Sequence, residues 1–133
     1  MFVIDQIAKD VYQIGIREGE VGPFGYVAFL LTGEPLTLIE PGSTRAARQF
    51  LDAIRHMGHD PAKVQYLVPT HIHVDHGGAA GFLLEHMPEA KVVFHERAAR
   101  HAIDPSRLIA GTAQAFGPRW EEMHGPILPV PEG

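Results

Sequence analysis

Four side chains of the kinds that bind metal ions stand within six residues near the middle of the chain: His71, His73, Asp75 and His76. Side chains alternate along an extended loop, so His71 and His73 project to the same side. Asp75 and His76 come where the chain turns towards a helix, so they are directed at a second point, next to the one that His71 and His73 face. Two imidazoles at one point and an imidazole with a carboxylate at the next suit two adjacent metal ions such as zinc. The spacing therefore predicts one side of a two-metal site.

The segments on either side of these residues fit that interpretation. An apolar run at residues 64–68 predicts a strand that ends at Pro69, and residues 79–87 predict a helix with Phe82, Leu83 and Met87 directed inward. Loops that follow strands in α/β sheets are the usual place for ligands. The alternative is a polar loop that contains several histidines by chance. The position of the motif between a strand and a helix makes this alternative the weaker interpretation.

The remaining elements alternate along the chain. Expected strands are residues 11–16, residues 26–31 and 36–39 as a hairpin, and residues 92–94. Expected helices run from an N-cap at Ser43 to Gly58, over residues 97–103, and from Asp104-Pro105 to about Phe116. From Gly117 onward prolines and glycines predict irregular structure. Strands followed by strand–helix units indicate an α/β (α+β) fold with a mixed sheet covered by helices.

Composition excludes several other classes of protein. The 133 residues are 45% hydrophobic and 20% charged, as in a globular domain, and the net charge is -5 with no basic run, so no nucleic-acid partner is expected. The chain has no cysteine, which excludes disulfides, cysteine-based zinc fingers and thiol nucleophiles. Neither a signal peptide nor an apolar stretch of about 20 residues is present. We expect a cytoplasmic protein that acts on a small molecule and binds no membrane.

The run Thr70-His71-Ile72-His73-Val74-Asp75-His76-Gly77-Gly78 resembles the H-x-H-x-D-H signature of the metallo-β-lactamase superfamily, and more narrowly its glyoxalase II-like hydrolases. The resemblance covers almost the whole chain. It implies that residues 1–133 are the N-terminal half of an αββα sandwich, a mixed sheet with helices on one face. It also implies two zinc ions, with iron or manganese as alternatives. His71 and His73 would bind the first ion, and Asp75 and His76 the second. The family's usual aspartate after the preceding strand maps to Glu40.

Two positions distinguish branches of this superfamily. A β-lactamase subclass with three zinc-binding histidines has a basic residue where this chain has His76, and the flavodiiron branch has glutamate at the position of His73. The chain is therefore more similar to thioesterase, lactonase, phosphodiesterase and tRNA-processing members. The acidity of the chain and its lack of a basic arm disfavour the tRNA-processing members.

The motif does not complete a two-metal site. Two metals need about six ligands, and the motif supplies four. In the family the others lie well downstream, so they are expected beyond Gly133. The histidines outside the motif are predicted to be surface or capping residues, with His95 and His124 the best candidates for further ligands; these histidines are His56, His59, His86, His95, His101 and His124. Alone, the chain is expected to be a weak metal binder that dimerises or pairs with a second-half chain.

The resemblance implies metal-assisted hydrolysis of an ester, thioester, lactone or phosphodiester in the complete protein. Asp75 would have two roles, as ligand of the second metal and as the group that orients the nucleophile. Three alternatives remain: a single-iron oxygenase of the persulfide dioxygenase type, a non-catalytic metal-binding or interaction module, and a structural fragment without metal. Phe116, Trp120 and Met123 are expected either in a lid over the substrate or in ordinary core.

Overall fold

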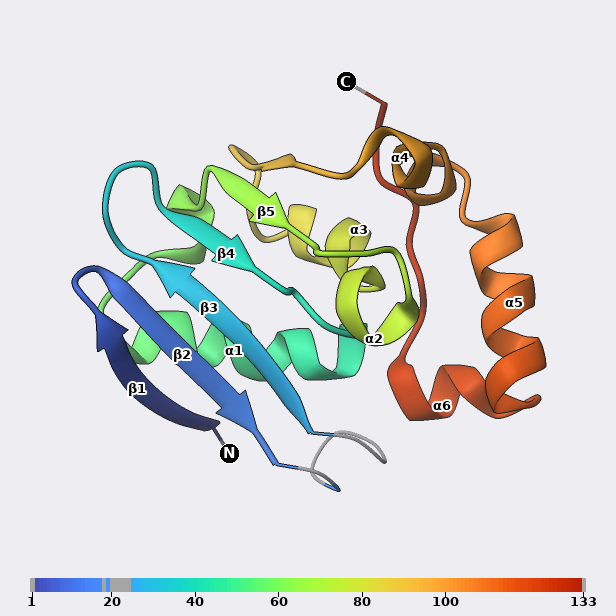
Figure 1. Ribbon diagram of the computed structural model, residues 1–133, viewed down its shortest axis with the longest axis horizontal. Helices are drawn as coiled ribbons and strands as arrows, with labels where there is room; N and C mark the ends of the chain where they lie inside the picture. The colour runs from blue at the N-terminus through green and yellow to red at the C-terminus, as the bar shows by residue number, and fades with distance from the viewer. Residues whose placement is uncertain (1, 18, 20–24, 133) are drawn as a thin grey trace.

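The computed structural model describes residues 2–17, 19 and 25–132, and a six-stranded sheet runs through them. The strands lie side by side in chain order (Figure 1): β1 (Phe2–Ala8), β2 (Val11–Ile16), β3 (Tyr26–Leu31), β4 (Thr37–Ile39), β5 (Tyr66–Val68) and β6 (Lys91–Val92). β1 to β4 are antiparallel, whereas β4, β5 and β6 run parallel. The predicted mixed sheet is confirmed. Residues 1 and 133, the ends of the predicted domain, lie outside the described residues.

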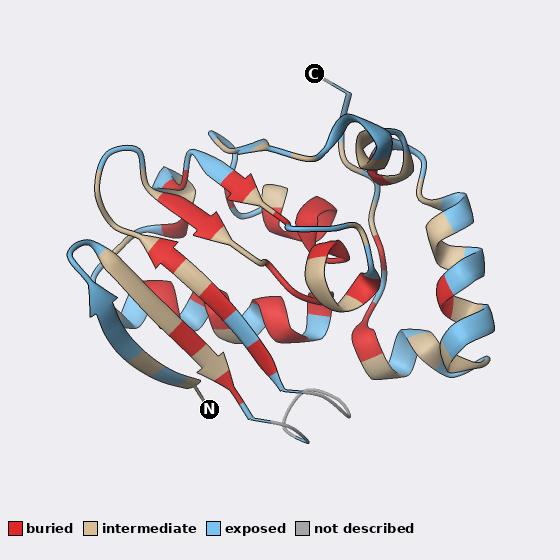
Figure 2. Cartoon of the chain, viewed as in Figure 1, coloured by how far each residue is buried: buried red, intermediate tan, exposed pale blue. Residues whose placement is uncertain are grey.

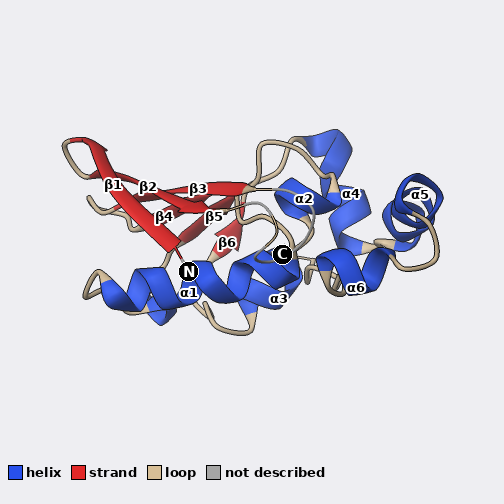
Figure 3. Cartoon of the chain, turned by 90° about the horizontal axis from the view of Figure 1, so that it is seen from below, coloured by secondary structure: helices blue, strands red, loops and turns tan. Residues whose placement is uncertain are grey.

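The helices gather on one face of the sheet and beyond one end of it. They are α1 (Thr44–His56), α2 (Val74–Gly77), α3 (Ala80–Leu84), α4 (Glu96–Ile103), α5 (Ser106–Phe116) and α6 (Trp120–His124), with a 3-10 turn, η1, at Pro61–Lys63. Figure 3 shows α1 and α3 beneath the sheet, and α5 and α6 beyond its end. No helix in the described part of the chain is long and apolar enough to cross a membrane.

The core lies between the sheet and α1. Ile14, Ala28, Leu30, Leu38 and Leu67 are fully buried, and their registers place them on the same face across neighbouring strands. The buried residues of α1 that meet them recur at helical spacing, as predicted: Ala46, Ala47, Phe50, Leu51 and Ile54. Ser43 caps this helix by accepting a hydrogen bond from the backbone N–H of Ala46. The core therefore fixes where α1 begins, next to the end of β4 and the beginning of β3.

Three parts of the chain differ from the prediction. The strand β1 was not predicted, because as an edge strand it leaves Val3, Asp5 and Ile7 exposed and has no clear alternation. The short helix α6 was expected to be irregular, because glycines and a proline surround it and no apolar period is visible in five residues. The helix after the motif begins earlier than predicted, since α2 already contains Asp75 and His76.

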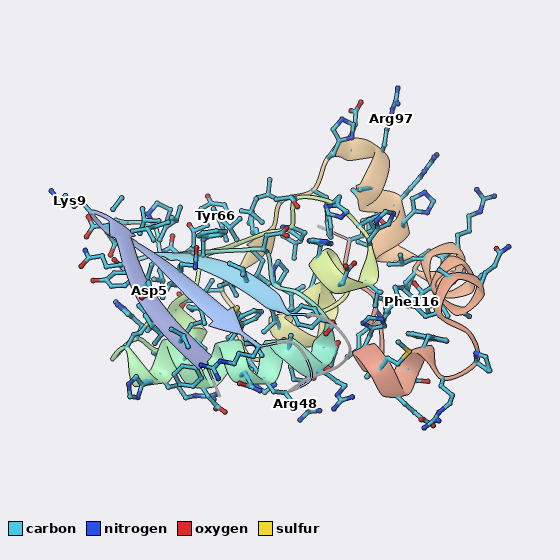
Figure 4. The ribbon with its side chains drawn as sticks, turned by 60° about the horizontal axis from the view of Figure 1, so that its bottom comes forward. Asp5, Lys9, Arg48, Tyr66, Arg97 and Phe116 are labelled. Carbon is cyan, nitrogen blue, oxygen red and sulfur yellow. The ribbon has the colours of Figure 1, made fainter. Side chains whose placement is uncertain are left out.

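The other face of the sheet is apolar and uncovered. Phe29 and Ile39 are cross-strand partners on this face, and Val27, 45% exposed, and Tyr66, 39% exposed, lie on it too. Figure 4 shows Tyr66 on one side of the molecule and Arg48, from α1, on the opposite side. Among the described residues, no helix or strand packs over this face (Figure 3). A contiguous apolar surface of this kind is typical of a face that another layer of protein covers.

We therefore expect the chain, when purified by itself, to associate through this face. Val27→Lys places a charge on the patch without touching α1, so it should shift the chain towards monomer in size-exclusion chromatography with light scattering. Ala110→Lys adds the same charge on the exposed surface of α5 and should leave the association unchanged. A wild-type chain that stays monomeric at every concentration tested would contradict the expectation.

Candidate metal centre

The site is built where two parallel strands end side by side. Ile39 and Val68 are register partners at the carboxyl ends of β4 and β5, and the backbone N–H of Glu40 donates to the carbonyl of Val68 at 3.0 Å. The carboxyl ends of parallel strands form the usual ligand edge of such sheets. Glu40 has a φ of 63°, in the left-handed region that non-glycine residues rarely adopt. This backbone turn places the Glu40 side chain beside the motif loop that follows β5.

The Glu40 carboxylate joins both ends of the motif loop. Its Oε1 accepts hydrogen bonds from the backbone N–H and the hydroxyl of Thr70, at 2.8 and 2.6 Å, and its Oε2 accepts from Nδ1 of His76 at 2.5 Å. The hydroxyl oxygen of Thr70 lies 3.0 Å from Nδ1 of His71. Since that hydroxyl gives its proton to Glu40, its oxygen accepts the Nδ1 proton of His71.

This network fixes the tautomer of two histidines. A carboxylate only accepts hydrogen bonds, so His76 carries its proton on Nδ1, and the same holds for His71 through Thr70. In its neutral form, each ring therefore offers the lone pair of Nε2 to a ligand. Metal-binding histidines commonly use this arrangement, in which the nitrogen not facing the metal donates to a carboxylate or another acceptor.

The three imidazoles of the motif lie next to one another. The ring centroid of His71 is 3.9 Å from that of His76 and 5.0 Å from that of His73, and Nε2 of His76 is 3.4 Å from Oδ2 of Asp75. Burial, followed by the neighbouring imidazoles of His76 and His73, lowers the pKa of His71 below its usual value. A neutral imidazole is the form that binds a metal. All four predicted ligands are thus brought to one surface.

Backbone contacts hold the loop against the start of α1. Gly42 donates its N–H to the carbonyl of His76 at 3.0 Å, and its carbonyl accepts from Ala79 at 2.9 Å. A Cβ on Gly77 would lie 2.8 Å from the carbonyl oxygen of His71, so a side chain there would force the loop apart. Val74, between His73 and Asp75, is buried. The ligand side chains therefore stand on a fixed support.

The donor set fits a borderline metal ion such as zinc, although it does not form a closed cage. Three imidazoles and a carboxylate match zinc's preferences, and two of the imidazoles have the outer hydrogen bonds that metal ligands use. Within the described ranges, no three ligand-type side chains surround a common point. The motif residues therefore remain candidate ligands, and any closed coordination sphere needs additional donors or a change of rotamer.

The other histidines have different surroundings. His95 is exposed and caps α4 by accepting from the backbone N–H of Arg97, as expected. His124, predicted as a surface or capping residue, is instead fully buried at the end of α6, where its Nδ1 lies 3.2 Å from the hydroxyl of Tyr26. Burial lowers the pKa of His124, and the negative charge of Asp75 opposes that shift. The prediction was wrong for His124 because α6 folds back onto β3, which its local sequence does not reveal.

The sequence matches one protein family over most of its length. A family model described as the Metallo-beta-lactamase superfamily matches residues 21–132. The chain belongs to the metallo-beta-lactamase superfamily. The fold agrees: a metallo-beta-lactamase from Cronobacter sakazakii superimposes with a TM-score of 0.65 at 21% identity, covering 96% of this chain and 45% of that one. A subclass B3 metallo-beta-lactamase from a soil metagenome library gives a TM-score of 0.61 at 25% identity, covering 71% of this chain and 33% of that one.

The curated proteins that match are named for different activities. The N-acyl homoserine lactonase AttM of Rhizobium johnstonii is 33% identical over 61 residues, which are 46% of this chain and 22% of that protein. The anaerobic nitric oxide reductase flavorubredoxin of Aliivibrio fischeri is 29% identical over 103 residues, 69% of this chain and 21% of that protein. The matched segments amount to about a fifth of the length of either relative.

The network around Glu40 generates a prediction about pH. Burial favours the neutral carboxyl, but hydrogen bonds from Thr70 and His76 outweigh it and hold the pKa of Glu40 below its usual 4.5. A lowered folded-state pKa means that Glu40 stabilises the fold above about pH 4.5 and that this contribution disappears as the pH falls through the folded-state pKa. In the metal-free protein at pH 7, Glu40→Gln should lower the free energy of unfolding by roughly 1–3 kcal/mol.

Denaturation by urea at several pH values measures this difference. The gap between wild type and Glu40→Gln should narrow steadily in acid, and Glu85→Gln, at an exposed position, should show no gap at any pH. A gap for Glu40→Gln that is constant down to the acid limit would show that its charge does not stabilise the loop.

Proposed function

We propose that the intact protein is a metal-dependent hydrolase with a dinuclear zinc site built on His71, His73, Asp75 and His76. Its substrate would be an ester, thioester, lactone or phosphodiester. The observation that supports this most strongly is the hydrogen-bond network of Glu40, which leaves Nε2 of two adjacent histidines available. A histidine-rich loop without a ligand has no need of fixed tautomers on neighbouring rings.

Zinc would supply Lewis acidity, which makes water acidic enough to be a nucleophile near neutral pH and polarises the bond to be cleaved. The chain's own residues would provide the positioning. Nδ1 of His71 and Nδ1 of His76 each donate to an oxygen, of Thr70 or of Glu40, which turns Nε2 of each ring towards a metal. Asp75, beside His76, presents a carboxylate that can accept a hydrogen bond from the attacking water and so orient it.

We assign the site to the glyoxalase II-like branch of the superfamily. Histidine at positions 73 and 76 supports this, since other branches carry glutamate or a basic residue there. A lactonase among the relatives supports an ester-like or lactone substrate. The two solved structures described above are metallo-beta-lactamases, so a substrate screen should include β-lactams with esters, thioesters and lactones.

The motif alone would give each metal only two protein ligands, whereas catalytic zinc is usually held by about three. The activity is therefore proposed for the intact protein, in which other residues would complete both metal spheres. Association through the apolar face of the sheet would bring a second layer of protein next to the motif edge and could carry those residues.

An iron-dependent oxidoreductase is the second candidate. The observation in its favour is the 29% identity to a nitric oxide reductase flavorubredoxin over 69% of the chain. Metal analysis of protein purified without added metal, with an oxygen-consumption assay, separates the two. Zinc and ester cleavage would support the hydrolase, whereas iron and oxygen uptake would support the oxidoreductase.

The first prediction here concerns metal content. Wild-type intact protein should contain about two zinc or similar ions. The double variant His71→Ala with His73→Ala should lose at least one of them, because it removes both imidazoles assigned to the first metal ion. Inductively coupled plasma mass spectrometry gives the metal-to-protein ratio. The matched control is His56→Ala with His86→Ala, two exposed histidines outside the motif, which should not change it. An unchanged ratio in the motif variant would refute the ligand assignment.

The second concerns Asp75. Replacing it by asparagine keeps the shape of the side chain but removes the charge that binds metal and orients water, so kcat/KM should fall roughly 10²–10⁴-fold. Circular dichroism should show an unchanged fold, and Asp52→Asn, on the exposed side of α1, should keep full activity. Turnover near the wild-type level in Asp75→Asn would mean that Asp75 serves only to start α2.

A further inference from the structure

A cavity of about 460 Å³ adjoins the motif loop. One wall is formed by His73, Val74 and Asp75 of the motif. The opposite wall is one face of α5: Arg107, Leu108, Gly111, Thr112, Ala115 and Phe116. The volume lies in the range of pockets that bind small molecules, and the α5 wall is mostly apolar, with Arg107 and Thr112 as its polar members.

The helix α5 does not use its apolar face to build the core. Its cavity-lining residues follow helical spacing, which normally directs a stripe towards the interior of a protein. Figure 2 shows α5 as mostly exposed or intermediate, and Thr112 is its only buried residue. The face therefore points at the cavity, across from the candidate metal ligands.

Gly111 lies in the middle of this face. A Cβ built on it would meet no atom within 4 Å, in contrast to Gly77 and Gly78, where backbone atoms lie within 3 Å. Glycine inside a helix destabilises it relative to alanine, so the position carries a cost that no neighbouring contact explains. What glycine provides there is room in the cavity, directly opposite the motif.

We propose that this cavity binds the apolar acyl chain of an ester or thioester substrate, and that Gly111 sets the chain length it accepts. The proposal rests on the proposed hydrolase function. The carbonyl carbon lies at the end formed by His73 and Asp75, and the acyl chain runs along α5 past Gly111 towards Phe116. In the reaction the oxygen of water bonds to the carbonyl carbon. The bond to the leaving alcohol or thiol then breaks with its electron pair, and the leaving group takes up a proton.

The test compares chain-length profiles in the metal-loaded intact enzyme. The substrates are the acetyl, butyryl and octanoyl esters of p-nitrophenol, and the variants are Gly111→Ala, Gly111→Leu and Ala110→Leu. Because one methylene changes kcat/KM in an apolar pocket by roughly 10- to 200-fold, Gly111→Leu should lower the octanoyl-to-acetyl ratio at least about tenfold. Gly111→Ala should have a smaller effect. Ala110→Leu, on the exposed side of the same helix, should keep the wild-type ratio.

Binding of octanoate, measured by isothermal titration calorimetry, tests the cavity without turnover. Wild type and Ala110→Leu should bind it, and Gly111→Leu should not. Gly111→Ala should melt a few degrees above wild type, because the helix gains stability, so its altered profile cannot come from unfolding. If wild type cleaves none of the esters but binds octanoate in a Gly111-dependent way, the hydrolase function fails and the cavity assignment stands. If Gly111→Leu keeps both the wild-type profile and the wild-type affinity, the inference is overturned.

Discussion

The carboxylate of Glu40 is the contact on which the rest of the site depends. It accepts hydrogen bonds from three groups of the motif loop, two on Thr70 and one on His76, although it lies 30 and 36 residues away from them in the chain. Each bond is to a charged acceptor, which makes it stronger than a bond between neutral groups. The same carboxylate also determines that Nδ1 carries a proton in both rings, directly in His76 and through Thr70 in His71. One residue thus sets the position of the loop and the chemical form of its ligands.

Glu40 can do this only because β4 and β5 are parallel neighbours. In a hairpin, two successive strands would end at opposite edges of the sheet, and Glu40 would lie far from the motif. The crossover through α1 removes this problem, and α1 packs under β1, β2 and β3 through a buried cluster that also contains Leu38 of β4 and Leu67 of β5. The apolar core is therefore not separate from the site, since it selects the strand order that brings the carboxylate to the imidazoles.

The motif and the main elements could be predicted because their information is local. Ligand spacing, the cap at Ser43 and the apolar period of α1 are all visible within a few residues. The link between Thr70 and Glu40 could not be predicted, since nothing near Thr70 indicates its partner. The longer side chain of glutamate reaches three groups on two residues, Thr70 and His76. The contact between His124 and Tyr26 spans 98 residues and depends on how α6 folds back. The edge strand β1 is mostly exposed, so its sequence lacks the alternation of apolar and polar residues that indicates a half-buried strand.

Two of the apolar surfaces within the described residues have shapes that indicate different occupants. The outer face of the sheet is broad and carries valine, phenylalanine, isoleucine and tyrosine side chains from neighbouring strands, which suits another protein layer. The face of α5 is narrow, includes a glycine with open space around it, and ends at the motif's histidine and aspartate. A protein layer over the outer face of the sheet would be stabilised by the apolar area that it buries. A helix packed into the second would instead block access to the ligands, so that space is better suited to a substrate.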